Sequence, residues 1–156
     1  MTALKLTQFL ALVLTALALV PGGAHLFAMP NKIDLAQTDY FIAQSVYRGW
    51  AWFGTVLIGA IVINFILTIM VRRRPLGFVL TAFNLLCLVA NLAIFFAWTF
   101  PANQATNNWT AVPANWEMLR TQWEYSHAIN AAITFVGFCS LAISVLVTPG
   151  KPSGAG

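Results

Sequence analysis

The stretch GWAWFGTVLIGAIVINFILTIMVRRR, residues 49–74, decides the fold class, because residues 49–71 carry no charge and three arginines follow them. A bilayer core about 30 Å thick is crossed by roughly 20 apolar residues in an α-helix. A helix satisfies all its backbone groups internally, which a single strand in lipid does not do. The stretch therefore predicts a transmembrane helix over 50–71 that ends at a basic anchor, Arg72–Arg74.

Three more segments without Asp, Glu, Lys or Arg flank this one, over residues 6–31, 75–116 and 125–150. By the same length argument they predict helices over 4–29, 76–100 and 122–147. The third segment turns polar at Pro101, which predicts a loop after that helix. Residues 35–48 predict a short interfacial helix between the first two spans, with Tyr40, Phe41 and Tyr47 at the headgroup level.

Composition agrees with this assignment. Of 156 residues, 60% are hydrophobic and 8% are charged, whereas roughly a quarter of a soluble domain is charged. We expect one all-α domain over 1–148, an integral membrane four-helix bundle, and a flexible C-terminal tail over 149–156. Its surface is expected to contact the lipid bilayer. The net charge of +4 is small, and no nucleic-acid partner is expected.

The basic residues predict the orientation. Lys5, Arg72–Arg74 and Lys151 fall on one side of this arrangement, and all four acids fall on the other. The side richer in Lys and Arg is the cytoplasmic one. A multi-pass membrane protein with both termini in the cytoplasm is therefore expected.

Polar side chains concentrate in the outer half of the predicted bundle. At 100° per residue, a set of side chains on the fourth span falls within about 40° of one line along the helix, and Glu124 lies beside it. This stripe contains Trp116, Arg120, Trp123, His127, Asn130 and Thr134. Lipid cannot satisfy such groups, so the stripe is expected to face the bundle interior. Asn91 and Trp98 lie on the partner stripe of the third span. His25 on the first span is expected at the depth of His127.

Several kinds of chemistry fit two histidines at one depth. His25 and His127 on facing helices could ligate a haem, or together with Met29 a copper ion. Acid–base chemistry is the metal-free alternative, with His127 oriented by Glu124 and Arg120 stabilising an oxyanion. None of these patterns has a diagnostic spacing, so the sequence assigns no metal and leaves the cofactor unknown. Asn84 and Asn91 are equally compatible with hydrogen bonding between helices.

The stretch PANQATNNWTAVPANWEMLRTQWEYSHAIN, residues 101–130, resembles the anthrone-oxygenase-like family of small four-helix membrane proteins, most of them bacterial. The matching positions are Pro101, Asn103, Trp116, Arg120, Trp123 and His127. The resemblance implies a bacterial inner-membrane protein with a polar outer pocket and, by its fungal branch, oxygenation of a polycyclic phenol without metal or flavin. Asn130 stands where many relatives carry Arg, so an activity that needs that arginine would not carry over.

Two functions follow as hypotheses. In the first, the bundle binds a small hydrophobic, phenolic or quinone-like molecule in an outward-facing pocket and acts as an oxygenase-like enzyme through His127, Arg120 and Glu124. The expected ligand contacts are His25, Asn91, Trp98, Asn103, Trp116, Trp123 and Asn130. In the second, the chain is a non-catalytic accessory subunit of a larger membrane complex, or a homo-oligomer, which packs through small residues such as Gly54 and Gly59.

Overall fold

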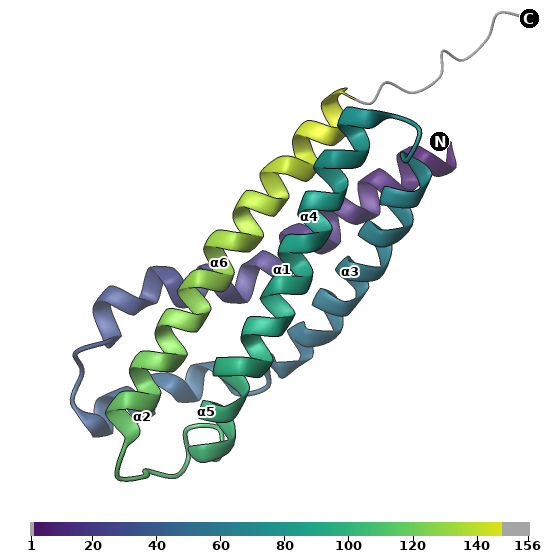
Figure 1. Ribbon diagram of the computed structural model, residues 1–156. Coiled ribbons are helices and arrows are strands. Elements are labelled where there is room, and N and C mark those ends of the chain that lie inside the picture. The colour runs from purple at the N-terminus through teal and green to yellow at the C-terminus, as the bar shows by residue number, and fades with distance from the viewer. Residues whose placement is uncertain (1, 148–156) are drawn as a thin grey trace, which may run out of the picture.

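Most of the described part of the chain is helical. The computed structural model describes residues 2–147, which contain no strand. Four long helices form the bundle: α1 (Ala3–Lys32), α3 (Phe53–Met70), α4 (Pro75–Ile94) and α6 (Trp116–Val147). Helices α1 and α4 each pack against both α3 and α6. The N-terminus and the end of α6 lie at one end of the bundle (Figure 1). The predicted all-α four-helix bundle is confirmed at this level.

Four segments are long and apolar enough to cross a membrane: Ala3–Lys32, Trp50–Met70, Pro75–Ala105 and Trp116–Val147. Three are longer than the sequence predicts. Helix α1 continues through Pro21 and Pro30 instead of stopping at residue 29, which apolar helices tolerate when neighbouring groups compensate the lost hydrogen bonds. Helix α6 begins at Trp116 instead of residue 122, because charges such as Glu117 end an apolar run without ending a helix. The tail predicted over 149–156 lies outside the described residues.

The third segment also passes the position where the sequence predicts a loop. Helix α4 continues through a π-helical turn, η3 (Phe95–Thr99), into α5 (Phe100–Ala105). Pro101 therefore lies inside a continuous helical segment, directly after the π-helical turn, and a local π adjustment is one way in which an apolar helix accommodates a proline. The chain then turns through Asn107, Asn108 and Trp109, all with positive φ.

The connection between α1 and α3 contains the expected short helix. It comprises α2 (Gln37–Gln44) and a 3-10 turn, η1 (Ser45–Tyr47), followed by a second such turn, η2 (Trp50–Trp52). Gly49 joins the two turns with φ of 87°, a conformation suited to glycine. The Tyr40 side chain is fully buried against the bundle.

The bundle buries many polar side chains beside apolar ones such as Leu67, Leu88 and Leu141, and it exposes many large hydrophobic side chains. Its buried side chains include Gln8, Thr15, Asn64, Thr81, Asn84 and Thr134. Its exposed side chains include many large hydrophobic ones, among them Phe9, Leu17, Ile58, Phe65, Leu86, Phe135 and Leu146. This distribution reverses the preference of soluble domains and is typical of helices that pack in lipid through small and polar residues.

Hydrogen bonds between helices satisfy part of this polar interior. The amide of Asn64 donates to the Thr15 hydroxyl (3.0 Å), and that of Asn84 donates to Asn64 Oδ1 (2.8 Å). These two bonds join α1, α3 and α4. The Asn91 amide donates to Thr134 Oγ1 (2.7 Å) and joins α4 to α6. The hydrogen-bonding interpretation of Asn84 and Asn91 is therefore confirmed.

Candidate functional site

A buried ion pair joins the first and last long helices. Lys32 Nζ on α1 lies 3.0 Å from Glu124 Oε1 on α6, and both side chains are within 5% of complete burial. Charges are rarely buried unless they are paired, and ionisable side chains buried between apolar helices are candidates for function. The pair is thus the centre of the candidate site.

Helix α2 supplies two more partners to the same carboxylate oxygen. The Tyr40 hydroxyl donates to Glu124 Oε1 (2.8 Å), and Gln44 Nε2 donates to it from 3.3 Å. Gln44 also donates to the Tyr40 hydroxyl. Burial and the adjacent Glu124 carboxylate raise the pKa of the Tyr40 phenol above its usual value. Tyr40 therefore remains a hydrogen-bond donor.

The two histidines lie beside the ion pair, at the common depth that the sequence predicts. The rings of His25 and His127 have centroids 4.1 Å apart, and Trp123 lies 4.6 Å from the first and 4.3 Å from the second. The Lys32 ammonium donates to His25 Nδ1 (3.4 Å), which places the proton of a neutral His25 ring on Nε2. The ring of Tyr47 also packs against His25, with the two centroids 4.0 Å apart.

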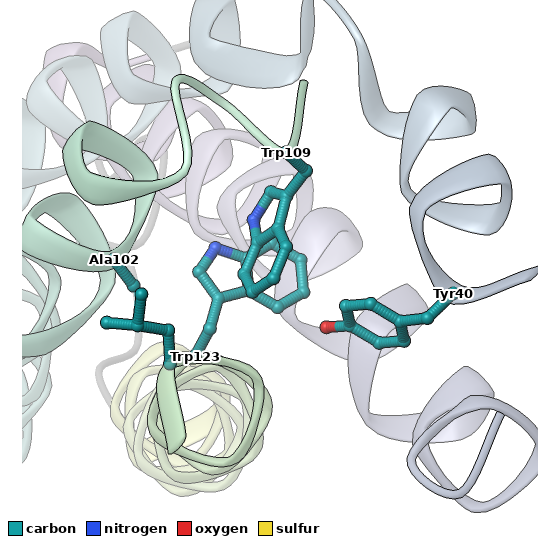
Figure 2. Close-up of a cluster of buried hydrophobic side chains, with 5 residues drawn as sticks. Tyr40, Ala102, Trp109 and Trp123 are labelled. Atoms are coloured by element: carbon teal, nitrogen blue, oxygen red, sulfur yellow. The ribbon is translucent and has the colours of Figure 1, made fainter. Parts of the chain in front are cut away.

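Further aromatic rings pack around Tyr40 and Trp123. Trp109 packs edge-on between Tyr40 (5.2 Å) and Trp123 (5.6 Å), and Figure 2 shows the Tyr40 hydroxyl directed toward these two indoles. Trp109 holds φ of 64° although it is bulky and buried. Backbone outliers of this kind concentrate at functional sites.

The Arg120 side chain holds the segment before α2. Its Nη1 donates to the Leu35 carbonyl (2.8 Å), and its guanidinium lies over the rings of Trp116 (4.7 Å) and Tyr40 (5.4 Å). Among the described residues, no ion pair joins Arg120 to Glu117 or Glu124. The Arg120 side chain turns instead toward the α1–α2 connection.

Four polar atoms around Tyr40 have no hydrogen-bond partner. Two are acceptors, Glu124 Oε2 and Gln44 Oε1, and two are donors, Trp109 Nε1 and Arg120 Nε. A buried polar atom without a partner costs about 1–3 kcal/mol. Such a group of unpartnered donors and acceptors within one site suits a bound molecule that carries polar atoms of its own.

The remaining predicted site residues are divided between the cluster and other places. Asn103 accepts a hydrogen bond from Trp123 Nε1 (2.8 Å), so it supports the cluster. Asn130 is buried, with an unpaired Oδ1. Asn91 bonds Thr134 between helices. Trp98 is half exposed and lines an outer groove with residues of α6, away from the ion pair.

Glu124 does not orient His127, contrary to the expected acid–base arrangement. The hydrogen bonds of the described residues direct Glu124 Oε1 to Lys32, Tyr40 and Gln44, and none of them joins it to His127. The sequence interpretation misses Lys32, Tyr40 and Gln44 because it assigns them to the membrane surface. The pair could have been predicted from one signal in the sequence: a lysine ends one apolar span, and a glutamate lies near the start of another at the same side of the bundle.

The histidines do not fit a haem. Their rings touch each other and Trp123, which leaves no space for a porphyrin plane between them. In the part of the chain that the structure describes, no three His, Cys, Asp or Glu side chains gather as metal ligands. The cluster is therefore best described as an ion pair with two imidazoles and surrounding aromatic rings.

No family model, curated protein or solved structure matches this chain. The residues themselves therefore carry the functional argument.

Proposed function

We propose that this chain is a multi-pass membrane protein that binds a small phenolic or quinone-like molecule at the Lys32–Glu124 cluster. The apolar exterior and the four long apolar helices support insertion in a bilayer. The basic Arg72–Arg74 turn lies at the same end of the bundle as the N-terminus (Figure 1), which supports cytoplasmic termini by the excess of positive charge. The cluster then lies in the outer half.

The observation that carries the ligand proposal is the burial of Lys32 and Glu124, because no other Asp, Glu, Lys or Arg among the described residues is buried. A hydrophobic pair would hold α1 and α6 together at least as well. The charges are therefore better explained by a ligand whose oxygen atoms they contact. Aromatic neighbours such as Trp123 and Tyr47 suit a flat ring.

The geometry suggests a role for each group. Lys32 stabilises the oxygen anion of a bound phenolate. The sequence alone gives this role to Arg120, but the Arg120 guanidinium donates to the Leu35 carbonyl. His127 serves as the base: no hydrogen bond among the described residues uses its ring nitrogens, and its ring lies in the cluster. In an oxygenase-like reaction, O2 would oxidise the bound phenol to a quinone: one oxygen atom would replace a ring C–H bond, and the other would leave as water with the two hydrogens.

Purification in a mild detergent tests the proposal, with mass spectrometry of co-eluting molecules and calorimetric titration with 2-naphthol and 1,4-naphthoquinone. We expect micromolar binding by the wild-type chain and at least a tenfold loss in His127→Ala and Glu124→Gln. The matched control is Glu117→Gln, an exposed glutamate on the same helix, which should bind as the wild type does. O2 consumption on adding 2-naphthol would extend the proposal to catalysis.

An accessory subunit is the second candidate, and one feature favours it. A groove of about 760 Å³ opens on the opposite face of α6 and is lined by Ile94, Trp98, Met118, Thr121, Gln122, Tyr125, Ser126 and Ile129. An apolar groove of this kind accepts a helix of a partner subunit. A chain that binds neither probe and co-purifies stoichiometrically with larger membrane subunits would favour this role over ligand binding.

A further inference from the structure

The Tyr40 side chain is a phenol held by the contacts that a protein uses to bind a free phenol. Its hydroxyl donates to the Glu124 carboxylate (2.8 Å) and accepts from Gln44. Its ring is edge-on to Trp109 (5.2 Å), and a guanidinium lies over it at 5.4 Å. A charged acceptor, a neutral donor and a set of π contacts together define a site complementary to a hydroxylated ring.

The side chains around Tyr40 have more hydrogen-bonding capacity than Tyr40 uses. Glu124 Oε2 and Gln44 Oε1 lack donors, and Trp109 Nε1 lacks an acceptor. Glu124, Gln44 and Trp109 are each at least nine-tenths buried, so bulk water does not compensate these atoms. One tyrosine hydroxyl cannot satisfy them. A ring with a second oxygen substituent could donate to one of the acceptors and accept from the indole.

Helix α2 carries Tyr40 on a short connection at the end of the bundle (Figure 1). Its other face is exposed, including Thr38, Asp39 and Ile42. The polar ties between this connection and α6 are the bonds of Tyr40 and Gln44 to Glu124 and the bond of Arg120 to Leu35. Gly49 supplies a left-handed turn after it. Helix α2 also packs through Tyr40 and Phe41 against Trp109 and Trp116. It has only eight residues, and a short element of this kind can open locally as a unit.

We propose that Tyr40 occupies, as a tethered stand-in, the subsite for a ring of a phenol with at least two oxygen substituents. Helix α2 is then a lid: an arriving ligand replaces the Tyr40 hydroxyl on Glu124, and the lid moves out with its tyrosine. This inference rests on the proposed function and deepens it, because it names the ligand class and the groups that recognise it. It also explains how a ligand enters a cluster whose rings are already in contact.

Calorimetric titration with 2,3-dihydroxynaphthalene in detergent tests the inference, with naphthalene as the probe that lacks oxygen atoms. Removing the stand-in by Tyr40→Ala should tighten binding of the diol at least tenfold over the wild type. The matched control is Phe41→Ala, which removes the neighbouring ring of α2 that also contacts Trp109 but that does not reach Glu124. Its affinity should stay within twofold of the wild type. Adding Glu124→Gln to Tyr40→Ala should remove the gain.

The outcomes separate this inference from the proposed function. Equal or weaker binding of the diol by Tyr40→Ala would place the ligand elsewhere and overturn the inference, while ligand binding itself would stand. An equal gain for naphthalene would show a plain cavity and would also overturn it. Absence of diol binding in every variant would overturn both. Should Tyr40→Ala not fold, Tyr40→Phe decides, with a gain of at least threefold expected and an unchanged affinity contradicting the inference.

Discussion

At the scale of single residues, Lys32 and Glu124 depend on each other. Each is almost completely buried, and each provides the opposite charge within 3.0 Å of the other. The attraction of a buried pair offsets the cost of removing both charges from water only while both are present. Loss of one partner therefore harms the bundle more than loss of both.

We predict that Glu124→Gln lowers the free energy of unfolding by about 3–5 kcal/mol, because it leaves the Lys32 ammonium buried without a carboxylate. The double variant Lys32→Met with Glu124→Leu should recover most of this loss. Chemical unfolding in detergent measures the four corners of the cycle. The control Glu117→Gln should change stability by less than about 0.5 kcal/mol. Additive effects of the two single substitutions would show that the pair is not coupled.

At the scale of elements, the contact between α4 and α6 depends on a glycine. A Cβ atom added at Gly137 would lie 2.8 Å from Cys87 Cβ and 2.9 Å from Asn84 Oδ1. Close approach of backbones through small residues is the usual way in which membrane helices pack. The contact cannot accept a methyl group without separating the two helices.

Gly137→Ala should therefore destabilise the chain by about 1–3 kcal/mol, the usual cost of overpacking a filled interface. The matched control is Gly23→Ala on α1, where an added Cβ would meet nothing within 4 Å. That substitution should be neutral or stabilising by up to about 1 kcal/mol, because alanine favours a helix. Thermal unfolding of both variants in detergent compares them. Equal midpoints would contradict the close contact seen at Gly137.

The elements also show where sequence patterns stop being informative. The absence of charge locates all four long helices, because the need for about 20 apolar residues is a property of each segment alone. The extension of α4 through η3 to Ala105 is not visible in this way, since a π-helical turn follows from packing and not from residue periodicity. The ends of α1 and α6 are missed for the same reason: polarity marks the apolar run and not the helix.

The candidate site was predictable in part. The stripe on the fourth span correctly brings Trp123 and His127 toward His25, because helical periodicity fixes which side chains share a face. The position of Lys32 against Glu124 and the burial of Tyr40 depend on how α2 folds back onto the bundle. That return is a long-range arrangement, and a single sequence has no local signal for it.

At the scale of the whole molecule, the charge distribution predicts one orientation. In a cysteine-free background (Cys87→Ala with Cys139→Ala), we introduce either Arg73→Cys at the basic turn or Gln104→Cys in α5, both at exposed positions. A membrane-impermeant maleimide added to intact cells should label the second variant and not the first, because the basic turn is expected in the cytoplasm. Lysed cells serve as the control, in which both should react. The reverse pattern would invert the proposed topology.

The ion pair between α1 and α6 also has a consequence for biosynthesis. The ribosome makes Lys32 early and Glu124 only when the last helix emerges, so with the proposed insertion the nascent chain carries an ammonium without its counter-charge until that helix arrives. An unpaired lysine near lipid is unfavourable. Assembly is thus completed by the arrival of the last helix, and a truncated chain would display an unpaired lysine that cellular quality control can recognise.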